Sequence, residues 1–204
     1  MTKLSDCHLC KERAILGPVA GCGDLNSRIL LLGRNPGVQE VEKGMPFVGP
    51  AGQKLDEVLD KAGIRREKCY VTNLVKCGTI NPDPPSKACF GLCPKTWLVH
   101  ELKEMMEKNL RLIISFGNEA LEYLEPGATV GRMAGTHWTV HLRQGQEGVE
   151  KDVEVFAMYH PAAALHSQVF DRRLKEDTLR LRRYLDDFRD EWEELMKWPQ
   201  HTKK

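Results

Sequence analysis

Four cysteines in two separated pairs are the residues of this chain best suited to hold a metal. Cys7 and Cys10 form a C-x-x-C pair near the N-terminus, and Cys77 and Cys93 flank a Pro-rich stretch further along. Four thiolates can ligate a [4Fe–4S] cluster or a structural zinc ion, and the number of thiolates does not distinguish the two. The pattern therefore predicts a metal centre held by these four residues, with Cys89 as a competitor for the fourth position.

Three polar side chains could bind a polar ligand, and each follows a hydrophobic run: Asn35, Asn73 and His160. Asn35 lies in the loop Gly33-Arg-Asn-Pro-Gly37, where Pro fixes one backbone angle and Gly permits a positive φ, so the loop can turn sharply and present the amide. An amide offers a donor and an acceptor together. Taken singly, a Gly-Pro turn, a strand-capping Asn and a backbone-bonded His explain these residues equally well.

The elements that must position these side chains alternate between strands and helices. The buried strands are predicted at Arg28-ILLLG, Cys69-YVTNLV, Leu112-IISFG and Val153-EVFAMYHP, and the main helices at 53–62, 95–109, 118–124 and the C-terminal amphipathic segment. This order predicts an α/β fold with three layers, α/β/α, around a central, mostly parallel, four-stranded sheet, with an edge hairpin over 130–150. Ligands of such sheets bind beyond the carboxyl ends of the strands, where all three polar residues fall.

Length and composition limit the class of protein. A chain of 204 residues, 41% hydrophobic and 29% charged, is most economically a single soluble domain over 1–204, with a flexible tail over about 197–204. The absence of a membrane-spanning run or signal peptide predicts a cytoplasmic or nucleoid-associated protein with no membrane partner. Seven cysteines in a reducing compartment favour metal ligands or buried thiols over disulfides. The net charge of +1 neither supports nor excludes nucleic acid.

Four segments, in this order, resemble the motif set of the uracil-DNA glycosylase superfamily: Gly33-RNPG, Pro46-FVGPAG, Val71-TNLVKC and His160-PAAAL. Together with the cysteine arrangement, they are most similar to the family 4 enzymes, over nearly the whole chain. The resemblance implies a glycosylase-like fold and a [4Fe–4S] cluster in preference to zinc. It also implies a monomeric, monofunctional DNA glycosylase of base-excision repair. Such an enzyme flips uracil out of DNA and excises it by hydrolysis. Other deaminated bases are further candidate substrates.

The resemblance also implies roles for single residues. Phe47 would stack on the flipped base, and Asn73 would hydrogen-bond to the edge of the base through its amide. His160 would stabilise the negative charge that develops on the base as the glycosidic bond breaks. Asn35 and Glu40 would hold the attacking water. The remaining substrate contacts would come from the first motif, at Gly33, Arg34 and Gly37, and from Leu165 as a wedge in the vacated stack.

The first motif departs from the family 4 pattern, which usually has Gly-Glu-Ala-Pro-Gly. Arg34 stands in place of Glu and Asn35 in place of Ala, and an Asn here resembles other branches of the superfamily. An amide is no strong general base, but its carbonyl can orient a water. The substrate range therefore stays open, and Arg34 could meet a phosphate or pair with a nearby carboxylate.

Two other functions remain open. A protein of the same fold could bind damaged DNA without catalysis, or the chain could be a zinc-stapled nucleotide-binding module. In the glycosylase interpretation, DNA contacts are expected from backbone amides of the Gly/Pro loops and from dispersed cations: Lys76, Lys87, Lys95, Arg132, Arg172 and Arg173. Of these, Arg172 and Arg173 are the favoured phosphate contacts.

Overall fold

A computed structural model describes residues 4–10, 15–79, 85–144, 148–188 and 192. The tail predicted at about 197–204 lies outside these residues. Within the described part of the chain, no helix combines the length and the apolar character needed to cross a membrane.

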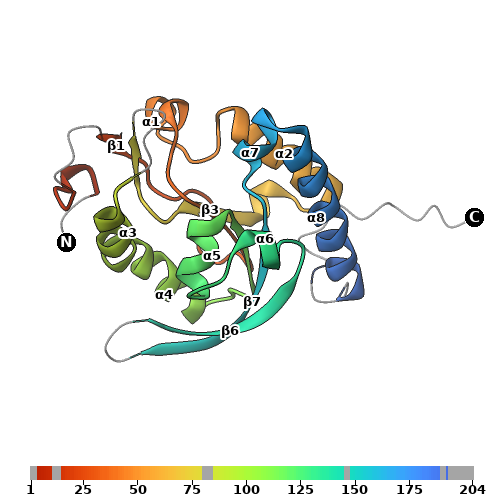
Figure 1. Cartoon of the computed structure of the whole chain (residues 1–204). Coiled ribbons are helices and arrows are strands. Elements are labelled where there is room, and N and C mark those ends of the chain that lie inside the picture. The colour runs from red at the N-terminus through yellow and green to blue at the C-terminus, as the bar shows by residue number, and fades with distance from the viewer. Residues whose placement is uncertain (1–3, 11–14, 80–84, 145–147, 189–191, 193–204) are drawn as a thin grey trace, which may run out of the picture.

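A five-stranded sheet forms the centre of the fold (Figure 1), and its strand order is β3-β2-β5-β7-β6. The strands are β3 (Cys69–Asn73), β2 (Ile29–Gly33), β5 (Leu112–Phe116), β7 (Val149–Met158) and β6 (His137–Gln144). The first four are parallel, and β6 pairs antiparallel with β7. The predicted fold class is confirmed. The predicted number of four strands was one too low, because the segment expected as an edge hairpin adds β6 to the same sheet.

Helices cover both faces of the sheet, as the continuous apolar runs of its inner strands require. One face carries α2 (Pro50–Ala62), α6 (Val130–Met133), α7 (Pro161–His166) and α8 (Gln168–Asp187). The other face carries α4 (Val99–Glu107) and α5 (Asn118–Leu124) (Figure 1). Every residue of β2, β3 and β5 is buried, so these strands form a rigid base for the loops that follow them.

A smaller unit lies beside the main sheet. Strands β1 (Ile15–Pro18) and β4 (Cys77–Thr79) pair antiparallel, and α3 (Lys87–Cys93) follows. The helix predicted over 95–109 is in fact a π-helical turn, Pro94–Leu98, followed by α4. Helix α1 (Val38–Lys43) lies against β1 and β4, which brings the first motif close to this unit.

Candidate functional site

The loops after the four parallel strands meet at one edge of the sheet, as predicted. Gly33 ends β2 and Asn73 ends β3, and the two residues lie directly opposite each other in parallel register. Gly117 follows β5 and His160 follows β7 by two residues. A Cβ atom on Gly117 would lie 3.3 Å from the Cβ of His160, so these two loops are also in contact. Four strands thus contribute to a single site.

Gly33 forms the floor of this site. A Cβ atom at Gly33 would lie 2.5 Å from Oδ1 of Asn73 and 2.5 Å from Cζ of Phe47, so only a glycine leaves these two side chains in place. Asn73 is 3% exposed, and its side-chain amide forms no hydrogen bond with any residue that the structure describes. Buried amides are normally paired. Asn73 is therefore available to a ligand that offers both a donor and an acceptor.

Phe47 lies over this floor in an unusual backbone conformation. Its φ of +54° is in the left-handed region, which costs a non-glycine residue about 1–2 kcal/mol. Its ring centroid lies 5.9 Å from that of His160 with an interplanar angle of 21°, and 6.1 Å from that of Phe116. The aromatic face and the imidazole thus border the same space, as the motif resemblance implies.

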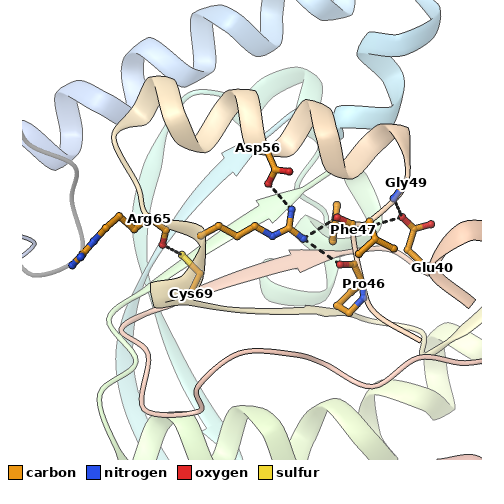
Figure 2. A network of polar contacts seen from close by, with 9 residues as sticks. Glu40, Pro46, Phe47, Gly49, Asp56, Arg65 and Cys69 are labelled. Atoms are coloured by element: carbon orange, nitrogen blue, oxygen red, sulfur yellow. Dashed lines mark hydrogen bonds and ion pairs between the residues drawn. The ribbon is translucent and has the colours of Figure 1, made fainter. Parts of the chain in front are cut away.

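The conformation of Phe47 is maintained by a residue that the sequence did not single out. Arg66 donates through Nη2 to the carbonyl oxygens of Pro46, at 3.2 Å, and of Phe47, at 2.8 Å, and its Nη1 pairs with Asp56 at 2.6 Å (Figure 2). Gly52 in α2 passes so close that a Cβ atom there would lie 1.9 Å from the Phe47 carbonyl oxygen. No local sequence pattern predicts this contact, because the two carbonyl oxygens belong to residues about twenty positions before Arg66.

Glu40 supports the same loop from the other side. Its carboxylate accepts hydrogen bonds from the backbone N–H groups of Gly37 at 3.1 Å and Val48 at 3.0 Å. It also accepts one from the backbone N–H of Gly49 at 2.7 Å (Figure 2). The residue is 8% exposed. Both carboxylate oxygens are therefore engaged with backbone donors, and Glu40 links the start of α1 to the loop that carries Phe47. This arrangement gives Glu40 a clear structural role.

Asn35 and Arg34 form a chain of contacts that ends on a further residue. Arg34 donates from Nε to Oδ1 of Asn35 at 2.8 Å, and Nδ2 of Asn35 donates to the carbonyl oxygen of Pro36 at 3.0 Å. Nη1 of Arg34 lies 3.3 Å from Oε1 of Glu119. Of the two kinds of partner considered for Arg34, the structure shows the carboxylate. Glu119 could have been considered, because it lies just beyond the end of a predicted strand.

The protonation of His160 follows from its neighbours. Nδ1 accepts the backbone N–H of Ala162 at 3.1 Å, so in the neutral ring the proton resides on Nε2. Burial, and to a smaller extent the positive charge of Arg34, lower the pKa of His160 to about 4, and Glu119 opposes both effects. The imidazole is therefore neutral near pH 7, with one N–H available as a donor.

Four other residues predicted to contact DNA differ in their exposure. Leu165 is 41% exposed at the end of α7, as a wedge must be. The prediction that Lys76 contacts DNA was wrong, because the residue is 1% exposed and its Nζ binds Oε2 of Glu101 at 2.6 Å and Oγ1 of Thr72 at 2.5 Å. Arg172 and Arg173 do lie on the surface.

Arg172 and Arg173 belong to a cleft between α6 and α8. The cleft has a volume of about 490 Å³, and four of its lining residues are arginines: Arg132, Arg172, Arg173 and Arg180. Tyr159, which precedes His160, also lines it, and its hydroxyl accepts a hydrogen bond from Arg173 at 2.5 Å. A positively charged surface thus begins one residue away from the site.

The four predicted metal ligands line a single cavity of about 60 Å³: Cys7, Cys10, Cys77 and Cys93. N–H groups point at two of the sulfurs, from Nε1 of Trp97 to Cys7 at 3.3 Å and from the backbone of Lys76 to Cys93 at 3.2 Å. Among the described residues, no three metal-binding side chains converge on one point as the ligands of a single ion.

Cys89 lies close to this group but does not line the cavity. It is 1% exposed, and Oγ of Ser86 donates to its sulfur at 3.6 Å. The Cys89 thiol is near enough to Cys10 to contribute, after burial, to the rise of the pKa of Cys10 to about 12. The four predicted ligands thus line the cavity, and Cys89 lies next to one of them, Cys10.

Comparison with known proteins agrees with the motifs. The profile of the uracil DNA glycosylase superfamily matches residues 20–185. The type-4 uracil-DNA glycosylase of Archaeoglobus fulgidus is 36% identical over 153 residues, which make up 72% of this chain and 72% of that protein. The type-4 uracil-DNA glycosylase of Pyrobaculum aerophilum is 32% identical over 174 residues, 84% of each chain. That of Saccharolobus solfataricus is 30% identical over 181 residues, 86% of this chain and 78% of the relative.

Proposed function

Because the chain belongs to the uracil-DNA glycosylase superfamily, we propose that it is a monofunctional glycosylase that excises uracil from DNA. The observation that carries the proposal is the buried, unpaired amide of Asn73 beside Gly33 and the ring of Phe47. Uracil presents a carbonyl acceptor and an N–H donor on one edge and a planar face on each side. Asn73 matches that edge and Phe47 matches a face.

The reaction breaks the bond between C1′ of the deoxyribose and N1 of the base. The bonding electrons leave with the base, which becomes an anion, and the sugar becomes an oxocarbenium ion. Nε2–H of the neutral His160 donates to a carbonyl oxygen of the base and stabilises the developing charge. The oxygen of a water molecule then bonds to C1′, and its proton passes to solvent or to the departed base.

We assign the positioning of this water to Asn35 in preference to Glu40. Both oxygens of Glu40 already accept backbone N–H groups. Oδ1 of Asn35 accepts a single hydrogen bond, from Arg34, and a carbonyl oxygen has a second lone pair. An amide is sufficient if bond breaking precedes water attack, since the electrophile is then highly reactive and needs no strong base.

Water, and not a lysine, is the proposed nucleophile. Lys76 is the lysine in the motifs, and its ammonium is buried between Glu101 and Thr72. It cannot reach a flipped nucleotide without breaking both contacts. The proposed enzyme therefore leaves an intact abasic strand.

We propose a [4Fe–4S] cluster for the cysteine cavity, in preference to zinc, because the motifs resemble the family 4 enzymes. Four thiolates that line one cavity can ligate either group. The residues that would hold the cluster are Cys7, Cys10, Cys77 and Cys93. When bound, it would cross-link the N-terminal segment to β4 and α3, which is a structural role.

The proposal is tested on a labelled oligonucleotide that carries one uracil, as a single strand and opposite guanine or adenine. We expect alkali-labile breaks at the uracil, and a panel with hypoxanthine, xanthine and thymine would define the base range. His160→Ala and Asn35→Ala should each lower the rate by about 10²-fold. Lack of breaks on all three uracil substrates would rule out the uracil assignment.

One observation favours a non-catalytic damage-binding protein as the second candidate. The amide of Asn35 already contacts Arg34 and the Pro36 carbonyl oxygen, as would suit a purely structural residue. Tight binding of uracil-containing DNA without base release, unchanged by Asn35→Ala, would select this function.

A further inference from the structure

The ion pair of Arg34 and Glu119 lies beside the site residues Asn35 and His160 and has no assigned role in the reaction. We propose that Arg34 is a charge-stabilising residue for base excision, held in position by Glu119. This role rests on the proposed function and adds to it a positive charge beside the neutral donor His160.

The position of Arg34 follows from the sheet. Arg34 comes directly after the last residue of β2, and Glu119 lies in the first turn of α5, directly after β5. Strands β2 and β5 are neighbours, so the pair spans the carboxyl ends of two adjacent strands. Their side chains are 40% and 37% exposed, so both groups are accessible to a ligand.

The guanidinium group has donors to spare. Of its five N–H groups, Nε–H binds Asn35 and one on Nη1 faces Glu119. The other three have no hydrogen-bond partner among the residues that the structure describes. Arg34 is therefore fixed in orientation by two partners and can still donate to a third group.

The positive charge of Arg34 acts on the imidazole of His160. Arg34 lowers the pKa of His160 more strongly than Glu119 raises it, so the pair produces a net positive potential at the imidazole. The imidazole donates to the base in the proposed reaction, so the same potential favours an anionic base there. The substitution of the usual acidic residue by Arg34 would then replace activation of the water by stabilisation of the leaving group.

If Arg34 and Glu119 were only an exposed, structural ion pair, substitution of both residues would have a different effect on the excision rate. Such pairs contribute little to stability, so a neutral, hydrogen-bonding pair at the same two positions should replace one with little loss. If Arg34 acts on the reaction, the neutral pair Arg34→Gln/Glu119→Gln cannot restore the rate, because no positive charge then lies beside Asn35. The two explanations therefore differ in the outcome of one double substitution.

The experiment measures the single-turnover excision rate on uracil-containing single strands. We expect Arg34→Gln to lose about tenfold or more, less than the loss of a buried donor because Arg34 is partly exposed. Arg34→Lys should be intermediate, since it retains the charge but loses the planar donor fork. Glu119→Gln should lose less than Arg34→Gln. Lys108→Gln is the control, because Lys108 pairs with Glu104 at 2.7 Å and is similarly exposed.

A second measurement does not need turnover. Free uracil binding is titrated from neutral to alkaline pH, where uracil loses a proton. The wild type should bind more tightly as the anion forms, and Arg34→Gln should lose this pH dependence while Lys108→Gln retains it. This result would support the role of Arg34 even if the wild type released no base from DNA. Failure to release base would refute the proposed function and leave the binding result for Arg34 standing.

Two results would overturn the role of Arg34. One is an excision rate of Arg34→Gln equal to that of Lys108→Gln, with the same pH dependence of uracil binding. The other is a wild-type rate in the neutral pair Arg34→Gln/Glu119→Gln, which would make the contact purely structural.

Discussion

His160 shows how two contacts prepare a side chain for a specific chemical role. The backbone N–H of Ala162 determines which ring nitrogen carries the proton, and burial lowers the pKa of the imidazole to about 4. Neither effect is visible in the sequence, although the position of His160 after a strand is. The residue could be predicted as a site residue, but its tautomer and charge could not.

The first prediction concerns the pH dependence that His160 produces. Its pKa is about 4 in the folded protein, against the ordinary value of 6.5 for a histidine side chain, so the unfolded chain binds more protons between these two pH values. The free energy of unfolding should therefore decrease as the pH falls through this window, and His160→Gln should weaken this dependence. The single-turnover rate should show no titration of His160 near pH 6.5. Thermal unfolding and rate measurements across this range check both points, and a rate that falls with a pKa near 6.5 would contradict the neutral imidazole.

Other residues of the site could be predicted from the sequence only in part. Phe47 and Asn73 were found because their motifs are specific. Arg66 and Glu119 were not found, because each acts on a loop that is distant in sequence. Glu40 was assigned to water, and only the structure shows its carboxylate on three backbone N–H groups. Contacts between loops depend on the packing of the elements that carry them.

At the scale of the element, the segment between α1 and α2 is stabilised from two sides. Arg66 holds the carbonyl oxygens of Pro46 and Phe47, and Glu40 holds the N–H groups of Val48 and Gly49. These contacts offset the cost of the left-handed backbone at Phe47. The segment that carries Phe47 is thus held in place before any ligand binds.

The second prediction follows from this support. Arg66→Gln removes the charge and the forked donor that bind both carbonyl oxygens, so Phe47 should leave its left-handed conformation more often. We expect a loss of about 1–3 kcal/mol in the free energy of unfolding and a rate at least about tenfold lower. Arg143→Gln is the control, because Arg143 pairs with Glu150 on an exposed strand. Equal effects of the two substitutions, measured by denaturant titration and single-turnover kinetics, would refute the role of Arg66.

The third prediction separates the cysteines. Cys77→Ser and Cys93→Ser remove cavity-lining ligands, so the purified protein should lose most of its iron and unfold at a lower temperature. Cys89→Ser should retain iron and visible absorbance, because Cys89 does not line the cavity. Iron analysis and absorbance spectroscopy test this. Loss of iron in Cys89→Ser with retention in Cys93→Ser would exchange their assignments, and zinc in place of iron would refute the cluster.

At the scale of the whole molecule, the regular part of the fold was predictable and its additions were not. The inner strands are continuous apolar runs with both faces covered, and such runs are recognisable from the sequence. Strands β1 and β4 are short and pair across nearly sixty residues, so no local pattern indicates them. The pairing of β6 with β7 in the main sheet was also missed, because a hairpin pattern does not specify which sheet it joins.

The fourth prediction concerns the surface that we expect to contact DNA. The cleft with Arg132 and Arg172 lies next to the pocket, so a phosphate flanking the flipped nucleotide should bind there. Arg132→Gln and Arg172→Gln should each weaken binding of single strands whatever their sequence, and lower the slope of log affinity against log salt by about 0.7. Lys103→Gln, on α4 across the sheet, should leave the slope unchanged. Fluorescence anisotropy at several salt concentrations measures this, and equal slopes for all variants would exclude the cleft.

The central claim is that the pocket of Asn73, Phe47 and His160 releases uracil by hydrolysis. It is tested most directly by quantifying free base from a single-uracil oligonucleotide under single-turnover conditions, with mass analysis of the strand. We expect one equivalent of free uracil and an intact abasic strand from the wild type, and a rate about 10²-fold lower for Asn73→Ala. A wild type that binds this oligonucleotide and releases no uracil, or a strand cleaved without alkali, would contradict it.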